Sequence, residues 1–319
     1  MNSSLLFLRP LLVLFALLLI GSASGQQVAD TAFRPPIPHP AYPAGQGPLV
    51  VIDEAHHNFH TASGRYLPFA NLLRRDGYVV RAGRNKFSPK ALAAVKILVI
   101  SNALAKQNAN VENWSLPTPS AFTDQEITTI RDWVNGGGAL LLIADHMPMA
   151  GAAEKLGAAF GIHWSNGFAL DEGQSGPLLF KRETGTLADH PITNGRAPEE
   201  RIDTVATFTG SAFQGDSAFQ PLLTFKSPVV SLMPKTAWEF DESTPRLPVA
   251  GWMQGAVRLY GRGRIAVFGE AAMFTAQLAG PNKIPVGMNS PLAPQNAQFL
   301  LSVAHWLSGL LDQPGSHHP

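Results

Sequence analysis

The chain has 319 residues, enough for one large α/β domain or two small ones. Its 24 Lys and Arg residues nearly balance 23 Asp and Glu residues, and the formal charge is +1. No overall field would therefore draw the protein to nucleic acid or to an anionic membrane, and nucleic acid is not an expected partner. The absence of cysteine excludes disulfides, thiolate metal ligands and a cysteine nucleophile.

The first 25 residues are typical of a secretory signal peptide. A short polar start with Arg9 precedes an apolar run from Leu11 to Ile20, and small residues follow as far as Gly25. The run is too short for a stable membrane span. We therefore expect cleavage after Gly25 and a soluble, exported protein, periplasmic or secreted, without a stable span. An uncleaved N-terminal anchor is the alternative.

Residues 26–47 contain five prolines and no apolar periodicity. This composition predicts an extended, Pro-rich lead-in outside the core. A single domain is then expected over residues 48–311, and residues 312–319 are expected to form a flexible tail.

The first half of this domain alternates between strand and helix patterns. Residues 48–53 form an unbroken apolar run of the kind that is buried on both faces of a parallel sheet. A helical pattern over 66–75 precedes a second strand at 78–83. Ser88 and Pro89 are typical of a helix start, and 96–102 predict a third strand. The order βαβαβ predicts a right-handed, doubly wound parallel sheet.

Residues 123–145 are the best-defined stretch. Thr123 and Glu126 predict a capping box, three glycines end the helix at 136–138, and an apolar strand follows. Another helix is expected over 149–161, and a late core strand near 263–270.

The region from about 162 to 250 predicts short strands and turns, which we interpret as a β-rich insertion with an edge of extra strands. An amphipathic helix over 297–311 closes the fold. Its predicted inward-facing residues are Phe299, Leu300, Val303, Trp306, Leu307 and Leu310. The expected fold class is thus α/β, with a mainly parallel flavodoxin-like sheet that carries helices on both faces.

Polar side chains follow the predicted parallel strands at the point where each strand ends. In open parallel sheets this edge is where ligands bind, so we expect these side chains to share one site. The candidates for catalysis are Asp53, His57, Asp145, His146 and Glu270. The candidates for ligand binding are Glu54, His56, Asn58, His60 and Asn102. Imidazole and carboxylate groups could hold zinc or manganese, and the first five residues are the candidate ligands. Without a metal, they could act as general acid and base.

Several of these residues also have a structural interpretation. Asp53 could accept backbone N–H bonds from the next loop, and Glu270 could cap the short helix that follows it. Since His56 and His57 are adjacent, at least one of them is expected to be solvated or packed. If Asp53 and His146 serve a site, Asp53→Ala and His146→Ala should abolish binding and leave the fold largely intact.

Three familiar catalytic patterns are missing or misplaced. The glycines at 136–138 precede a strand and do not link a strand to a helix, so they do not form a phosphate loop. The sequence contains neither a G-x-S-x-G elbow nor an H-E-x-x-H pair.

The stretch WVNGGGALLLIADHMPMAGAAEKLG resembles the class I glutamine amidotransferase-like fold, in which the turn after the strand carries a nucleophilic cysteine. Here Asp145 and His146 hold that place, and a chain without cysteine cannot be an amidotransferase. Together with VIDEAHHNFH, HPITNG and GRIAVFGEAAMF, the stretch resembles the nucleophile-less branch of that superfamily. This branch includes the trehalose-utilisation-like domains and an uncharacterised family related to gliding-motility and intraflagellar-transport domains. The resemblance spans about 48–311 and implies the fold, but it implies no catalytic residue.

Three functions follow as expectations. The first is an exported domain that binds a polar small molecule, such as a carbohydrate or cell-envelope fragment, at the strand-end edge. The second is a metal-dependent hydrolase or sugar-modifying enzyme that uses the same Asp, His and Glu side chains. The third is a scaffold for an envelope protein partner, with a vestigial site.

Overall fold

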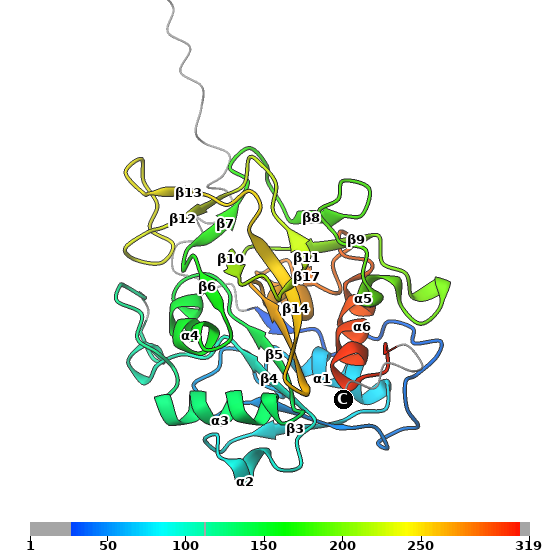
Figure 1. Ribbon diagram of the computed structural model, residues 1–319. Coiled ribbons are helices and arrows are strands. Elements are labelled where there is room, and N and C mark those ends of the chain that lie inside the picture. Colours follow the sequence, from blue (N-terminus) through cyan, green and yellow to red (C-terminus); the bar gives the residue numbers. More distant parts are fainter. Residues whose placement is uncertain (1–26, 112, 313–319) are drawn as a thin grey trace, which may run out of the picture.

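The computed structural model describes residues 27–111 and 113–312. Over these residues the chain is an α/β protein built on a nine-stranded mixed sheet (Figure 1). The predicted signal peptide and residues 313–319 of the predicted tail lie outside the described residues. Within the described part, no helix is both long and apolar enough to cross a membrane.

Five neighbouring strands of the large sheet run parallel. In spatial order they are β3 (Val79–Gly83), β2 (Leu49–Asp53), β4 (Ile97–Ser101), β5 (Ala139–Ile143) and β15 (Gly263–Phe268). Every residue of β4 and β5 is buried. Their unbroken apolar sequences are those expected of strands that are covered on both faces.

Helices cover both faces of the parallel strands. Along β4 and β5, Val99 and Leu141 belong to one core cluster, whereas Leu98 and Leu140 belong to another, because successive side chains point to opposite faces. The first cluster includes residues of α1 (Leu67–Arg75) and α6 (Asn296–Ser308). The second includes residues of α2 (Pro89–Leu92), α3 (Asp124–Asn135) and α4 (Met149–Ala158).

The remaining strands of the large sheet are antiparallel. They are β14 (Met253–Tyr260), β10 (Phe213–Gly215), β6 (Ile162–Trp164) and β11 (Gln220–Thr224). The first three continue the sheet beyond β15, and β11 also pairs with β14. The sheet is therefore mixed, and most of its antiparallel strands come from the β-rich region.

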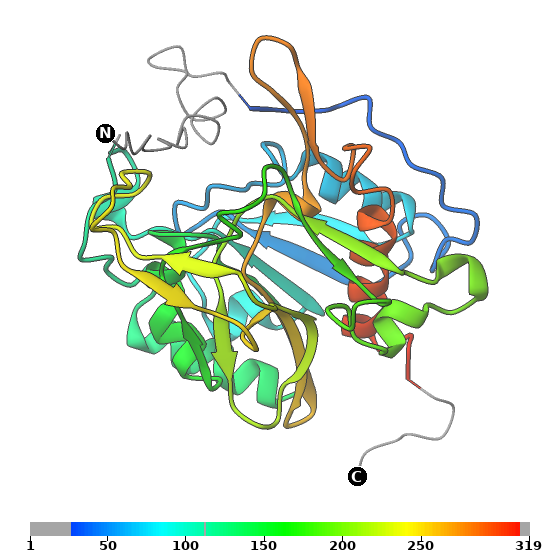
Figure 2. The same ribbon diagram turned by 90° about the horizontal axis from the view of Figure 1, so that it is seen from above.

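Three smaller sheets complete the described part (Figure 2). They comprise β7 (Phe168–Leu170), β12 (Val230–Leu232) and β13 (Arg246–Pro248); β8 (Leu178–Lys181) and β9 (Thr204–Thr207); and β1 (Val28–Ala29), β16 (Ala276–Ala279) and β17 (Ile284–Gly287). The short helical turns are α5 (Pro191–Asn194), η2 (Lys106–Asn108), η3 (Pro198–Glu200) and η4 (Ala272–Phe274).

The predicted helix starts are confirmed. The Thr123 hydroxyl accepts a hydrogen bond from the Glu126 N–H at 3.3 Å, and Glu126 Oε2 accepts one from the Thr123 N–H at 3.1 Å. Ser88 caps α2. The inward position predicted for Leu310 is wrong, because α6 ends at Ser308 and Gly309 turns the chain with φ +89. Leu310 lies beyond this turn and is 37 % exposed.

The lead-in lies against the core without forming part of it. Phe33, Ile37 and Tyr42 pack against the core cluster that contains α1 and α6. The Tyr42 N–H donates to the Asp76 carbonyl oxygen at 3.1 Å. Prolines hold this segment extended, and Figure 2 shows its backbone (dark blue) running along the outside of the domain.

Candidate functional site

The carboxyl ends of the parallel strands meet at one edge of the sheet. Ser101 lies opposite Ile143, and Ile143 lies opposite Phe268. The candidate residues follow these strand ends as expected, but they form two separate groups. The residues of the first group, beyond β2, hydrogen-bond mainly to one another, and the second group lies beyond β4, β5 and β15.

The first group is a buried ion network around His56. Its Nδ1 lies 2.8 Å from Asp53 Oδ2, and its Nε2 lies 2.9 Å from Glu126 Oε1. The imidazole also stacks on Phe87 at a centroid distance of 4.6 Å. All three polar side chains are almost fully buried. With a carboxylate at each ring nitrogen, His56 has no free atom to offer a ligand or a metal.

The opposite charges of this network shift the pKa values of His56 and Glu126 in opposite directions, and both shifts favour the charged forms. Burial alone would lower the pKa of His56, but the hydrogen bonds and charges of Asp53 and Glu126 raise it above its usual value. Burial alone would raise the pKa of Glu126, but the hydrogen bond from His56 and those from Thr123 lower it to about 2. The network is therefore an imidazolium between two carboxylates.

The network favours the structural interpretation of Asp53 and His56. Asp53 also accepts the Ala55 N–H at 3.1 Å, which is the structural role weighed from the sequence. The expectation that Asp53→Ala leaves the fold intact is replaced by one of destabilisation, because His56 would lose a buried partner. Glu126 was predicted only as a capping residue. Its contact with His56 spans 70 residues of sequence, and no local pattern indicates it.

The other polar residues of the loop after β2 mainly hold its shape. Glu54 Oε1 accepts the Ala62 N–H at 2.9 Å, and Asn58 Oδ1 accepts the His56 N–H at 3.1 Å. His57 is exposed, with φ +49. These contacts assign Glu54 and Asn58 to the loop structure and leave His57 at the surface.

His60 is buried against Tyr66, with ring centroids 4.6 Å apart. Its Nδ1 has no hydrogen-bond partner among the described residues. Burial, together with the smaller effects of nearby Arg65 and His146, lowers the pKa of His60 to about 3, so the ring is neutral. His60 is therefore a neutral ring that packs against Tyr66 and carries no charge at the strand-end edge.

The second group centres on Asp145. The Asp145 N–H donates to Asn102 Oδ1 at 2.9 Å, and Asp145 Oδ1 accepts the His146 N–H at 2.8 Å. Asp145 Oδ2 lies 3.4 Å from the Ala271 nitrogen, which joins the ends of β5 and β15. Asn102, Asp145, His146 and Glu270 are thus brought together, as the strand-end argument predicts.

Glu270 lies behind this group and caps η4. Its Oε1 and Oε2 accept the N–H groups of Ala272 and Met273 at 2.8 and 2.7 Å. Burial raises the pKa of Glu270 well above its usual value, and the charge of Asp145 adds to this effect. The capping role considered from the sequence is confirmed, and Glu270 is too buried to contact a ligand directly.

His146 lies between two aromatic rings at the surface. Its centroid is 4.5 Å from that of Phe168 and 4.6 Å from that of Trp238. Nδ1 donates to the Met147 carbonyl oxygen at 2.8 Å, and no described residue hydrogen-bonds to Nε2. Trp238 is 44 % exposed. Sequence reasoning missed Trp238 and Phe168, since they follow none of the predicted parallel strands.

Several residues with strained backbone conformations lie at the same strand-end edge of the sheet. Five described residues other than glycine have positive φ, and three of them, His57, Asn102 and Trp238, lie here. The value of +69 for Trp238 is exceptional for a bulky side chain. Such conformations cost of order 1–3 kcal/mol each and persist where the surroundings enforce them, often at ligand sites.

The five residues considered as metal ligands do not form a metal centre. Among residues 27–111 and 113–312, no group of three or more His, Asp or Glu side chains is arranged to hold a metal ion. Both oxygens of Glu270 are engaged by backbone N–H groups, and Asp53 is engaged by His56. The zinc or manganese hypothesis therefore does not fit the donor set.

Replacing Asn102 with alanine should destabilise the protein by about 2–4 kcal/mol. The substitution leaves the buried Asp145 N–H without its acceptor and places alanine at φ +49. Asn102→Gly also removes the acceptor but adopts φ +49 without strain, so it serves as the matched control and should be less destabilised than Asn102→Ala. Urea unfolding of both variants measures the difference, and a glycine variant as stable as wild type would contradict the role of Asn102 as an acceptor.

Together, the sheet and its covering helices define an α/β domain with a polar strand-end edge. No family model matches the sequence, and no curated protein matches it. A solved structure described as the mmIFT52 N-terminal domain is similar at 12% identity and a TM-score of 0.55, covering 85% of this chain and 100% of that one.

Two further structures are similar at lower scores. A cytoplasmic protein from Salmonella typhimurium has 13% identity and a TM-score of 0.48, with 82% of this chain and 98% of that chain covered. A ThuA-like protein from Bacteroides uniformis has 13% identity and a TM-score of 0.44, with 83% and 95% covered. At this level of identity, the likeness to the mmIFT52 N-terminal domain concerns the fold alone. It agrees with the fold that the sequence resemblance implied.

Proposed function

We propose that the protein is an exported, amidotransferase-like domain without a catalytic cysteine, which binds a polar ligand at the strand-end edge. The ligand class we favour is a carbohydrate or cell-envelope fragment. The strand order β3, β2, β4, β5, β15 supports a flavodoxin-like arrangement, in which ligands bind beyond the carboxyl ends of the strands.

One observation carries this proposal. At a single edge, the Nε2 of His146 has no partner among the described residues, and the imidazole packs against the half-exposed ring of Trp238, whose backbone is strained. The largely buried carboxylate of Asp145 accepts the His146 N–H and directly precedes it in the sequence. A sugar offers hydroxyl groups that can hydrogen-bond to Asp145 and His146, and an apolar ring face that can stack on Trp238. Aromatic rings with one apolar and one wet side are typical of such interfaces.

Calorimetric titration with neutral and acidic oligosaccharides and peptidoglycan fragments tests the proposal. We expect at least one of these to bind, and we expect His146→Ala and Asp145→Asn to weaken its binding at least tenfold, since each removes a hydrogen bond to the ligand. His163→Ala is the matched control, because His163 is exposed and lies on β6, away from the strand-end edge, where its partner is Glu154 of α4. Unchanged affinity in both site variants would contradict the proposal.

Export is part of this proposal and is supported by the composition of residues 1–25. The expected mature protein begins at Gln26. Sequencing of the N-terminus of the protein recovered outside the cytoplasm checks this expectation, and recovery of the uncleaved chain from the cytoplasm would contradict it.

A second candidate function is acid–base catalysis on a sugar derivative. It is favoured by the strand end where Asp145 and His146 are adjacent, since a carboxylate and an imidazole placed together are the groups that general acid–base catalysis uses. Turnover of a bound oligosaccharide that is lost in Asp145→Asn would establish the enzyme. Binding without turnover supports the first candidate. A protein partner that co-purifies equally with wild type and site variants would instead support the scaffold.

A further inference from the structure

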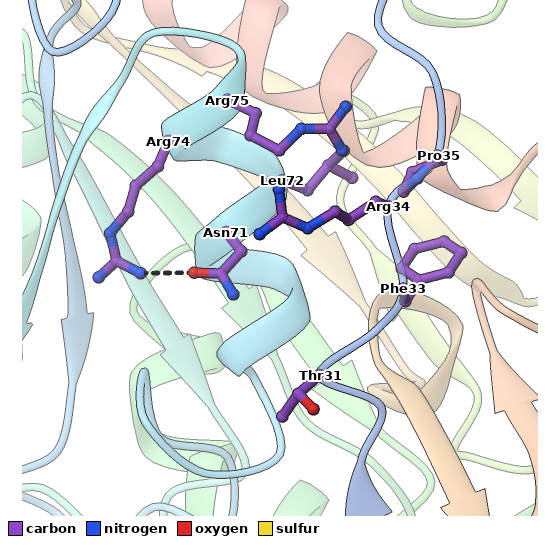
Figure 3. A pocket seen from close by; sticks show the side chains of 8 residues that line it. All are labelled: Thr31, Phe33, Arg34, Pro35, Asn71, Leu72, Arg74 and Arg75. Atoms are coloured by element: carbon purple, nitrogen blue, oxygen red, sulfur yellow. Dashed lines mark hydrogen bonds between the residues drawn. The ribbon is translucent and has the colours of Figure 1, made fainter.

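A separate hollow of about 180 Å³ lies between the lead-in and α1 (Figure 3). One wall comes from the lead-in and includes Phe33 and Arg34, and the other comes from α1 and includes Asn71, Leu72 and Arg75. Figure 3 shows Arg34 extending from the lead-in toward the helix, where Asn71 and Arg75 lie. None of these residues belongs to the strand-end edge.

The backbone that carries the exposed Arg34 is fixed by the fold on both sides of the hollow. Before it, Val28 pairs with Leu278 in the small sheet of β1 and β16. After it, the Tyr42 N–H donates to the Asp76 carbonyl oxygen at 3.1 Å. Phe33 packs against the core. The lead-in is therefore attached at both ends, and it holds a guanidinium opposite the last turns of α1.

The wall of the hollow is positively charged without compensation. It carries three arginines, Arg34, Arg74 and Arg75, and no carboxylate. In the part of the chain that the structure describes, neither of the two acids nearest in sequence pairs with these arginines: Asp30 accepts the Ala32 N–H and an Asn289 N–H, and Asp76 pairs with the buried His305 at 2.7 Å. Among the described residues, neither Arg34 nor Arg75 forms an ion pair.

Helix polarity accounts for only part of this charge. Arginines in the last turn of α1 are favoured by the negative end of the helix dipole, which explains Arg74 and Arg75. It does not explain Arg34, which comes from a different segment and adds like charge to the same hollow. Like charges placed together without a counter-charge repel one another, and a bound anion would remove this repulsion.

We propose that this hollow binds the phosphate group of a phosphate monoester. Guanidinium groups bind phosphate in bidentate fashion, and a dianion matches several of them better than a single carboxylate does. Asn71 Oδ1 accepts from Arg74 at 3.1 Å, which leaves the Asn71 amide N–H groups available to the anion. The hollow is larger than a phosphate, and Phe33 and Leu72 offer an apolar wall to the organic part of the ester.

Calorimetric titration of the full chain at fixed ionic strength tests the site with three probes: phenyl phosphate, inorganic phosphate and benzoate. We expect phenyl phosphate to bind most tightly. Arg34→Ala and Arg75→Ala should each weaken it at least tenfold, and Arg34→Lys should weaken it less, because the charge remains but the bidentate geometry is lost. Arg262→Ala, a change at an exposed arginine outside the hollow, should have no effect.

Several results would overturn the proposal. One is equal affinity for phenyl phosphate in wild type, Arg34→Ala and Arg75→Ala. Another is binding of benzoate as tight as that of phenyl phosphate, which would assign the hollow to carboxylates. If inorganic phosphate binds as tightly as phenyl phosphate, the hollow is a site for the free ion and not for an ester. His146→Ala should bind phenyl phosphate normally, so this test is independent of the strand-end site.

Discussion

Replacing His56 with alanine is expected to lower the free energy of unfolding by about 3–5 kcal/mol. The substitution removes the cation that lies between Asp53 and Glu126, at 2.8 and 2.9 Å. The buried carboxylate of Asp53 is left without a counter-charge, and Glu126 keeps only the exposed Lys86 at 3.6 Å. Urea unfolding followed by circular dichroism measures the loss. His163→Ala, at an exposed histidine beside Glu154, should change the stability by no more than about 0.5 kcal/mol.

The same network predicts how stability depends on pH. The pKa of His56 is raised in the folded state, so its contribution is complete below the unfolded value of about 6.5 and is lost as pH rises through the folded value. The pKa of Glu126 is lowered to about 2, so its contribution is complete above its unfolded value of about 4.5 and is lost as pH falls toward 2. The two contributions together are greatest between about pH 4.5 and 6.5.

This pH dependence should be reduced in His56→Ala. The difference in stability between wild type and the variant is expected to be largest near pH 5–6 and to shrink toward both pH 2 and alkaline pH. A difference that is constant from pH 3 to 9 would mean that His56 does not carry the charge assigned to it.

Replacing Trp238 with glycine is expected to abolish ligand binding at the strand-end edge with little cost in stability. Glycine adopts φ +69 without the strain that a side chain incurs, which offsets the packing lost from a ring that is 44 % exposed. The ring packs edge-on against His146 at 4.6 Å, so its removal also frees the imidazole to rotate. We expect at least a tenfold loss of affinity and a change of less than about 1 kcal/mol in stability.

Trp238→Phe is the matched control for this prediction. It retains an aromatic face beside His146 and should keep most of the affinity. If Trp238→Gly binds as well as wild type, the strained ring is not part of the site. If the glycine variant unfolds, the ring is a structural element of the loop, and its strain has no functional meaning.

The parallel strands could be predicted from the sequence because their signals are local. The apolar runs over 97–101 and 139–143 and the capping box at Thr123 are each contained in a few neighbouring residues. The strand-end rule then placed Asn102 and Asp145 together correctly. It needs only the direction of the strands, not the details of the loops.

The division of the polar residues into two groups could not be predicted. Whether His56 serves a ligand or an ion network depends on Glu126, which lies 70 residues away and has its own local role as a cap. Trp238 reaches His146 through a loop whose left-handed backbone no propensity favours. Contacts of this kind are set by tertiary packing.

The central claim is that ligands bind at the edge where Asn102, Asp145 and Trp238 meet. Hydrogen–deuterium exchange of the whole protein, with and without the tightest oligosaccharide found by titration, tests it most directly. The account predicts slower exchange in residues 102–104, 145–148 and 236–240, and unchanged exchange in α1 and the lead-in. Protection confined to any other region, while these three segments remain unchanged, would contradict it.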